Sequence, residues 1–418
     1  MLLLQLEAGE KLPRHLEAAG KAIASLVEEG VDAGLVRVWA YPHPGPVLAA
    51  AVVFAHLYRL GVTATFKVSV RPPAAVDYPS ILLGYPGLPY KAADVEARLV
   101  YMAQVERVRG HPPPGSVYLA VDGSLAVAYT LIVEASGLGG LSPELRAASL
   151  AGLYLDGRVG RTGRISGLDR VYVERLASKG QPKPMIVTTL KVYRPLSRPL
   201  CEALRKTAVP PMPLARDGED ACRERLAAAG LGPAAGRPAA RLERGELERL
   251  IDLVSGDDGL EAAEAASGLL VLEGSPLEDP REAAHALVYT LEASSSTAAI
   301  AASMVDPQVE LAAALGALEA RAPWIVDWAW GAELVRARGP GWLRLYSVEP
   351  QLESPSIAYM ALRSLGVLDE DTVIALVRED RLLVSPLQAA MADYELPKRL
   401  VESRVAREEG FWLEVSQA

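Results

Sequence analysis

The sequence predicts an α/β fold, in which a parallel-sheet domain is followed by a helical insert and a smaller α/β domain. Short apolar runs alternate with helical patterns along the first half of the chain, the rhythm of a parallel sheet covered by helices. The chain has 418 residues, of which 50% are hydrophobic and 23% charged. This length suits two or three domains, and the composition excludes a disordered or fibrous protein.

The first domain is expected over residues 1–212. Apolar residues at helical intervals across residues 5–31 open it, and three prolines within residues 42–46 force a turn after the first apolar run. The predicted strands lie at 35–40, 62–68, 80–84 and 98–102, and the predicted helices at 47–60, 124–137, 143–155 and 167–179. Because strands and helices alternate, we expect the strands to run parallel in one sheet.

The remaining chain is expected to form two further parts. Residues 213–280 predict a mostly helical connecting region, since 214–255 is charged and helical apart from an Ala, Gly and Pro interruption at 230–238. A smaller α/β domain is expected over residues 281–418. Its predicted helices lie at 280–294 and 309–320, and its strands at 342–348, 372–377 and 382–384.

Charge and cysteine content limit the classes of function. The chain carries 43 Lys and Arg against 52 Asp and Glu, a net charge of −9, which argues against a protein that coats duplex DNA but leaves room for a local basic channel. Cys201 and Cys222 are too few for a disulfide framework or a thiolate metal site, and we expect both to be reduced. No apolar run of 18 residues and no signal-peptide core occur, so a soluble, cytoplasmic protein is expected.

The amide content is also unusual. The sequence contains no Asn and seven Gln, which fits a thermophile. A GC-rich genome accounts for the same bias equally well.

The common catalytic motifs are missing. The five histidines are scattered, and neither a phosphate-binding P-loop nor a serine nucleophile elbow is present. A two-metal phosphoesterase needs several carboxylates at strand ends, whereas residues 41–46, 84–88 and 103–105 offer none. Asp156 is the one acid at a suitable position, with capping of the loop before Gly157 as its alternative role. His43 is either a lone ligand or a solvated turn residue.

One basic loop stands out. Arg158, Arg161 and Arg164 are spaced by three with glycines between them. Glycine allows close backbone approach and guanidinium pairs with phosphate, so these arginines are candidates for phosphate contacts. A solvated loop of charges is the alternative.

Several segments together resemble the DHH phosphoesterase superfamily, specifically its archaeal RecJ-like branch, which includes relatives of the cell-division-cycle-45 protein. The segments are DGSLAVAY (122–129), GLYLDGR (152–158), GLDR (167–170), LKVYRPLSRPL (190–200) and PPMP (210–213). The Ala-rich helix at 281–294 lies where the family begins its associated C-terminal domain. The resemblance therefore implies a DHH-like domain and a smaller associated α/β domain.

The departures from the family pattern lie in its metal motifs. His43 and Gly45 fall where active members carry two Asp after the first strand, and Gly84 falls at a further Asp position. Residues 103–105 stand in place of the DHH triplet, and the Gly-Gly-x-His segment near residues 402–410 is missing. Only Asp156 matches a family metal ligand. The resemblance thus implies a pseudo-phosphoesterase with degenerate motifs that binds neither metal nor cofactor.

A function also follows from the resemblance. It implies a structural subunit of the archaeal replicative helicase, associated with the nucleoid, with the GINS complex and the MCM helicase as partners and with single-stranded DNA guided along a cleft. No membrane partner is expected. Two alternatives stay open: a metal-dependent single-stranded DNA exonuclease, and a small-molecule or nucleotide-binding protein on the same fold.

Overall fold

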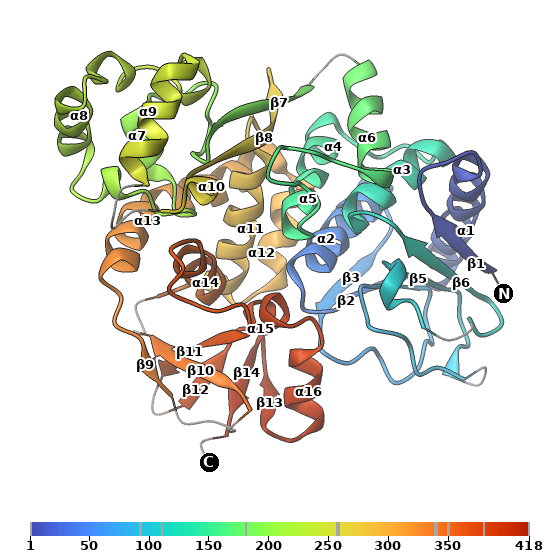
Figure 1. Ribbon diagram of the computed structural model, residues 1–418. Helices are drawn as coiled ribbons and strands as arrows, with labels where there is room; N and C mark the ends of the chain where they lie inside the picture. Colours follow the sequence, from blue (N-terminus) through green and yellow to red (C-terminus); the bar gives the residue numbers. More distant parts are fainter. Residues whose placement is uncertain are drawn as a thin grey trace.

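The computed structural model describes residues 2–91, 94–109, 112–179, 182–255, 260–337, 342–348, 352–378 and 381–416. Figure 1 shows a parallel sheet with helices at one end of the molecule, a second sheet near the C-terminus, and a helical layer beside them. His111, one of the five histidines, lies outside the described residues.

The first sheet has six parallel strands in the order β1-β6-β5-β4-β2-β3. The strands are β1 (Leu2–Leu6), β2 (Val36–Ala40), β3 (Ala64–Val68), β4 (Ser80–Leu83), β5 (Leu99–Gln104) and β6 (Ser116–Val121). Every residue of β4 and β6 is buried, as expected of central strands covered on both faces.

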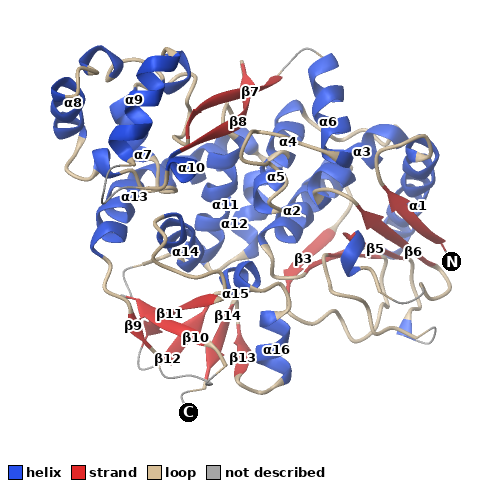
Figure 2. Cartoon of the chain, viewed as in Figure 1, coloured by secondary structure: helices blue, strands red, loops and turns tan. Residues whose placement is uncertain are grey.

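Helices cover one face of this sheet. They are α1 (Leu12–Ala33), α2 (Pro44–Arg59) and α3 (Leu125–Ser136). Long loops cover the opposite face and bury a tyrosine-rich cluster that contains Tyr41, Tyr85, Tyr101 and Tyr118. Figure 2 shows these loops in tan beside the strands. The prediction of a parallel sheet with flanking helices is confirmed, and in the described part of the chain the three long helices lie on the same face.

A helical layer follows, built on a two-stranded antiparallel ribbon. The ribbon pairs β7 (Lys183–Leu190) with β8 (Ala266–Glu273). Before it lie α4 (Pro143–Ser149), α5 (Ala151–Leu155) and α6 (Gly167–Ser178), and between its strands lie α7 (Leu200–Lys206), α8 (Glu219–Ala228), α9 (Arg244–Val254) and α10 (Ala262–Ala265). The helices between β7 and β8 enclose a hydrophobic cluster of their own, which runs from Leu190 to Ala265. The boundaries expected at 212 and 280 stay a prediction.

The two cysteines are paired in this layer. Cys201 in α7 and Cys222 in α8 form a disulfide, with their Cα atoms 5.8 Å apart. The expectation of reduced cysteines is therefore wrong. The loop that joins α7 to α8 lets the two helices pack against one hydrophobic core, and this brings Cys201 and Cys222 together. Their separation of 21 positions in the sequence does not reveal this contact.

The C-terminal part joins four helices to a second six-stranded sheet. The helices are α11 (Pro280–Ser294), α12 (Thr297–Val305), α13 (Ala312–Gly331) and α14 (Pro355–Ser364). The sheet has the order β13-β14-β12-β11-β10-β9, and only its β10–β11 pair is parallel. Its strands are β9 (Val335–Arg336), β10 (Arg344–Val348), β11 (Thr372–Arg378), β12 (Arg381–Val384), β13 (Ala406–Glu409) and β14 (Trp412–Val415), with α15 (Pro386–Ala392) and α16 (Leu396–Glu402) beside them.

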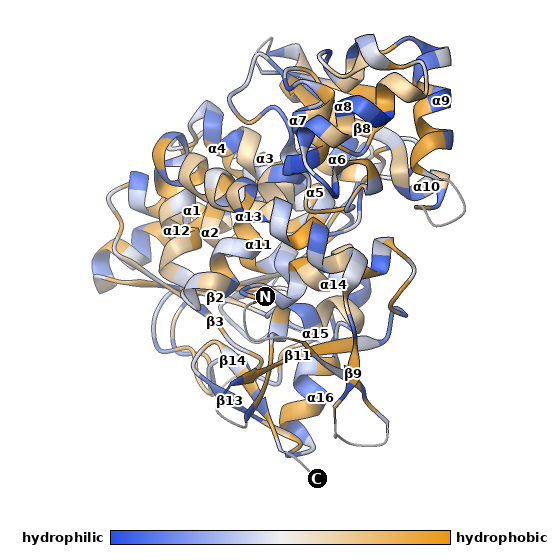
Figure 3. Cartoon of the chain, turned by 90° about the vertical axis from the view of Figure 1, so that its left-hand side faces the viewer, coloured by the Kyte–Doolittle hydropathy of each residue, from blue (hydrophilic) through white to orange (hydrophobic). Residues whose placement is uncertain are grey.

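The main core joins the two ends of the chain. Helix α12 packs against both α2 and α11, and Figure 3 shows these three helices in the middle of the molecule. Among the described residues, no single helix is long and apolar enough to cross a membrane, although α12 and the stretch Pro307–Gly331, bent by 115° against it, meet that requirement jointly on length and composition.

The expected opening helix over residues 5–31 is partly wrong. The chain begins with β1, which pairs with β6 at the sheet edge, and α1 begins only at Leu12. Leu4 and Leu6 are buried in the main core, so their apolar character serves a strand rather than the first turns of a helix.

Candidate functional site

The candidate site lies where the order of the strands in the parallel sheet reverses, between β2 and β4. The chain leaves β2 for β3 on one side, whereas β4 lies on the other side of β2. The connections that leave the carboxyl ends of the two neighbouring strands run to opposite sides at such a point, and open α/β sheets bind ligands there. His43 follows β2, Gly84 follows β4 directly, and Gln104 ends β5.

His43 caps the helix that follows β2. It precedes α2, and its Nδ1 accepts a 3.4 Å hydrogen bond from the backbone N–H of Gly45. Burial lowers the pKa of His43 to about 3, and the nearby positive charge of Arg107 lowers it further. The imidazole is therefore neutral at pH 7 and serves as a helix cap.

Asp156 is the carboxylate that the structure places at these strand ends. It follows α5, and its Oδ1 accepts a 3.4 Å hydrogen bond from Nε2 of Gln104. Its Oδ2 is buried and has no hydrogen-bond partner among the described residues. Burial raises the pKa of Asp156 to about 7, and the negative charge of Asp169 adds to the increase.

Gly45 lies directly against this carboxyl group. A Cβ atom built at position 45 would overlap Asp156. Gly45 and Asp156 are 111 positions apart in the sequence but in contact at the site. The structure therefore brings three predicted positions together here: His43, Gly45 and Asp156.

Tyr394 fills the space between the strand ends. It comes from the segment between α15 and α16, and its hydroxyl donates to the backbone carbonyl of Gly84. Its own carbonyl accepts a 2.7 Å hydrogen bond from the hydroxyl of Tyr41, and the two rings stack 5.0 Å apart. The Arg107 guanidinium lies 3.3 Å from the centre of the Tyr394 ring. An aromatic ring and a cation thus occupy the crevice of the sheet.

Gly84 makes this filling possible. Its φ is +75°, in the left-handed region that favours glycine, and a Cβ there would overlap Pro46 and lie 2.9 Å from the Tyr394 hydroxyl. A side chain longer than that of glycine at position 84 would therefore displace Tyr394 from its present place.

The residues present do not fit a pair of divalent cations. Such ions need several anionic oxygen ligands, and here one carboxyl group with a raised pKa faces a neutral histidine and a guanidinium. Across the ranges that the structure describes, no group of three or more His, Cys, Asp and Glu side chains is arranged to hold a metal ion.

The three arginines of the basic loop differ in their surroundings. Arg158 is held by two carboxylates, with its Nη2 2.9 Å from Asp122 and its Nε 3.0 Å from the fully buried Asp169. Arg161 is 74% exposed and lies 3.8 Å from Glu264. Arg164 is exposed and has no ion-pair partner in the described part of the chain. Arg161 and Arg164 are thus available at the surface, whereas Arg158 is engaged inside the protein.

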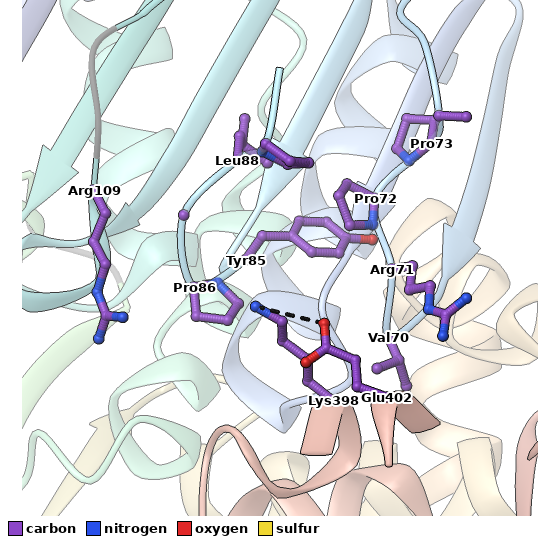
Figure 4. Close-up of a pocket in the computed structure, with 13 residues that line it drawn as sticks. Val70, Arg71, Pro72, Pro73, Tyr85, Pro86, Leu88, Arg109, Lys398 and Glu402 are labelled. Atoms are coloured by element: carbon purple, nitrogen blue, oxygen red, sulfur yellow. Dashed lines mark ion pairs between the residues drawn. The ribbon is translucent and has the colours of Figure 1, made fainter. Parts of the chain in front are cut away.

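A groove of about 640 Å³ lies beside the filled crevice, between loops of the parallel sheet and α16. Figure 4 shows Tyr85 across its centre, with Pro72 and Pro86 near the ring, Arg71 on one side and Arg109 on the other. Lys398 and Glu402 form an ion pair at its lower edge, and Arg109 lies 3.3 Å from Glu395. The groove has an apolar floor and a largely basic rim.

Tyr394 and Arg107 were not predicted from the sequence. Neither belongs to a motif, and Tyr394 reaches the site from 310 positions beyond Gly84 in the chain. No local pattern could have found Tyr394, because its role depends on how the C-terminal part packs against the parallel sheet.

No protein-family model matches the sequence, and no curated protein is significantly similar to it. Solved structures are similar in fold. CDC45 from Entamoeba histolytica has a TM-score of 0.55 at 9% sequence identity, over 99% of this chain and 96% of that one. RecJ from Thermus thermophilus in complex with Mn²⁺ has a TM-score of 0.39 at 12% identity, over 100% of this chain and 60% of that one. Exonuclease RecJ bound to manganese has a TM-score of 0.39 at 12% identity, over 96% and 90%.

The likeness to CDC45 extends over nearly the whole of both chains. It includes the parallel sheet, the helical layer and the C-terminal α/β part. The predicted fold class and the resemblance to the CDC45-like branch are therefore confirmed at the level of the fold: the chain has the fold of CDC45.

Proposed function

We propose that the protein is a non-catalytic, RecJ-like structural subunit of a replicative helicase, with the GINS complex and the MCM helicase as partners. One observation carries this proposal: Tyr394 and Arg107 occupy the crevice at the carboxyl ends of β2, β4 and β5. The CDC45 fold supports the choice of a replication subunit over an unrelated binding protein.

The charge of the crevice supports the lack of catalysis. Metal-assisted hydrolysis of a phosphodiester needs cations that activate water and neutralise the developing negative charge. Among the described residues, Asp156 is the carboxyl group that contacts Gly45 and Gln104, and its pKa of about 7 makes it a weak ligand at neutral pH. Arg107 already supplies a fixed positive charge against Tyr394.

The nuclease assay tests this part of the proposal. The full chain, incubated with Mn²⁺ and end-labelled single-stranded DNA, is expected to leave the strand intact. Asp156→Ala is the matched control, because degradation that persists in this variant comes from a contaminant. Clear 5′-to-3′ degradation by the unmodified protein that Asp156→Ala abolishes would overturn the proposal in favour of an exonuclease.

We further propose that the protein guides single-stranded DNA weakly, since its net charge of −9 repels the polymer over most of the surface. Two basic surfaces fit this role: the exposed pair Arg161 and Arg164, and the pair Arg71 and Arg109 on the rim of the groove. Arg158 is left out of the variants, because its loss would leave the buried Asp169 without its cation.

The salt dependence of binding distinguishes the two surfaces. Each phosphate contact that a substitution removes should lower the log–log salt slope by about 0.7 for a single strand, so a double variant on the strand path should lower it by about 1.4. Arg161→Ala/Arg164→Ala and Arg71→Ala/Arg109→Ala are compared with the unmodified protein by fluorescence anisotropy. A slope unchanged in both variants, or no binding at low salt, would contradict the guiding role and leave a scaffold alone.

A further inference from the structure

A second cavity lies away from the filled crevice and has a different chemical character. Its volume is about 230 Å³, and it lies between the loop that follows α5, the strand β8 and the helix α11. The loop is held to the strand by a 3.0 Å hydrogen bond from the N–H of Gly268 to the carbonyl of Arg161. A Cβ atom at Gly268 would overlap the loop backbone at Thr162, so glycine is required for this close approach.

Three cationic side chains line the cavity, from an exposed rim to a buried floor. The Arg161 side chain is 74% exposed, that of Lys191 is 18% exposed, and that of Arg281 is 7% exposed. Glu264 is the carboxylate in the lining, 3.1 Å from Lys191 and 3.8 Å from Arg161. Asp279 pairs with Arg281 at 3.4 Å beside the cavity. Three positive charges thus face two negative ones, and the cavity keeps a positive excess.

Arg281 is held in place by contacts inside the protein. Its Nη1 donates a 2.9 Å hydrogen bond to the carbonyl of Lys191, and its guanidinium lies 5.2 Å from the ring centre of Tyr193. The contact with this carbonyl joins Arg281 to the backbone of Lys191, whose ammonium group also lines the cavity. Arg281 is thus positioned by these contacts and the Lys191 ammonium group by Glu264 before any ligand arrives, which reduces the entropy lost on binding.

His285 adds a neutral donor to the same cavity. It is buried, with 7% of its surface exposed, and its Nδ1 lies 2.7 Å from the hydroxyl of Tyr193. Burial raises the pKa of Tyr193 and lowers that of His285 to about 3, so both groups are uncharged at pH 7. With the Tyr193 hydroxyl as donor, Nδ1 is the acceptor and Nε2 carries the proton. Among the described residues, the hydrogen bond that the structure shows for His285 is the one at Nδ1.

We propose that this cavity binds a small anion of the phosphate class, either free phosphate or the phosphate group of a small monoester. Lys191 and Arg281 would supply the charge, His285 a directional N–H donor, and Arg161 a flexible cation at the entrance. The volume is below the roughly 300–1,000 Å³ typical of sites for larger organic ligands, which favours a phosphate group with at most a small appendage.

The chemistry of the lining favours phosphate over a simple halide or a carboxylate. Phosphate presents several oxygen acceptors around one centre, which matches donors that converge from a loop, a strand end and a helix. A positive excess held away from bulk water strengthens the attraction, since an effective dielectric constant lower than that of water applies there. The cavity lies outside the filled crevice, so this inference is independent of the proposed scaffold role.

Titration calorimetry of the full chain with inorganic phosphate, and in a second arm with ribose 5-phosphate, tests the proposal. Lys191→Met keeps the length of the side chain and removes its charge, and we expect it to weaken phosphate binding at least tenfold. Lys183→Met is the matched control, because Lys183 begins β7, the strand that Lys191 follows, but is exposed and pairs with Glu273. Equal affinity in the two variants, or phosphate binding no tighter than chloride, would overturn the proposal.

A measurement on the unmodified protein keeps the test independent of folding. In protein labelled with ¹⁵N at histidine, phosphate is expected to shift the ring signals of His285 while those of His15 and His56 stay in place. His56 is a suitable internal control, because both of its ring nitrogens have partners, Tyr129 and Gly139. A uniform shift of all histidines, or none, would contradict the site. Binding of Lys191→Met to GINS is expected to be unchanged, so failure of the anion site leaves the scaffold proposal intact.

Discussion

At the carboxyl end of the parallel sheet, the absence of a side chain at Gly45 leaves room for the carboxyl group of Asp156. Gly45→Ala places a methyl group where this carboxyl lies, and overpacking of this kind costs about 1–3 kcal/mol. We expect chemical denaturation to show a loss of unfolding free energy in this range. Removing the obstacle in Gly45→Ala/Asp156→Ala should recover part of the loss.

Gly316→Ala is the control for this prediction. Gly316 lies on the exposed side of α13, where nothing lies within 4 Å of an added Cβ. Replacing a helical glycine by alanine there should raise stability by about 0.5–1 kcal/mol. Equal effects of the substitutions at positions 45 and 316 would mean that Gly45 and Asp156 are not in contact.

Asp156 should also give the stability of the protein a pH dependence. Its pKa is raised to about 7 in the folded chain, above the ordinary value of an unfolded aspartate near 4. Between these values the unfolded chain releases a proton that the folded chain keeps, so stability falls as pH rises from about 4 to 7 and is constant above. Asp156→Asn should remove this fall and make the protein more stable than the unmodified chain at pH 8.

Thermal unfolding of the unmodified protein and of Asp156→Asn at a series of pH values checks this predicted fall in stability. Asp252→Asn, on the exposed side of α9, is the matched control and should leave the profile unchanged. An Asp156→Asn profile parallel to that of the unmodified protein would contradict a buried, protonated Asp156.

The sequence could place some of these residues and not others. His43, Gly84 and Asp156 follow apolar runs or a predicted helix, and strand ends in a parallel sheet meet at one edge, so their proximity could be expected. That Arg161 and Arg164 are exposed while Arg158 is not depends on Asp122 and Asp169, which reach Arg158 only through tertiary packing. Their regular spacing in the sequence does not distinguish the exposed arginines from the one that is held by carboxylates.

At the scale of elements, prediction was best for α11, whereas α13 extends to Gly331, beyond the predicted end at residue 320. Helix α11 begins and ends where its pattern predicts, because Asp279 caps it and Pro280 suits its first turn. The strands β7 and β8 were missed, since they pair across the whole helical insert and β7 lies in a proline-rich stretch. β13 is short and carries charged side chains, so it lacks the apolar alternation of a strand.

The disulfide gives the helical layer a testable dependence on oxidation. Cys201 and Cys222 join α7 to α8 and are the only cysteines in the chain. A bond that closes a loop of this size contributes about 3 kcal/mol by restricting the unfolded chain. Reduction, or Cys201→Ser/Cys222→Ser, should therefore speed hydrogen exchange in α7 and α8 while the strands of the parallel sheet stay protected.

Hydrogen exchange monitored by mass spectrometry separates these regions. The unmodified protein in reductant and the double variant without reductant should give the same pattern, since no other disulfide exists to be reduced. Unchanged exchange in α7 and α8 under both conditions would show that the bond does not hold this layer.

At the scale of the whole molecule, buried polar contacts tie the C-terminal part to the rest. Glu292 of α11 accepts hydrogen bonds from Ser354, Ser356 and Ser385, which lie at the first turns of α14 and α15. Burial raises the pKa of Glu292, and these donors oppose the increase. Together with Tyr394, which reaches back to Gly84, these contacts fix the second sheet beside the filled crevice. The molecule is thus built to hold its two α/β parts in one arrangement.

Such an arrangement suits a scaffold, whose surface must keep its shape for its partners. Purification of the full chain from native extract, with mass spectrometry of the eluate after nuclease treatment, tests this central claim most directly. The proposal expects subunits of both GINS and MCM to remain bound once DNA has been removed. An eluate that contains neither GINS nor MCM would contradict it.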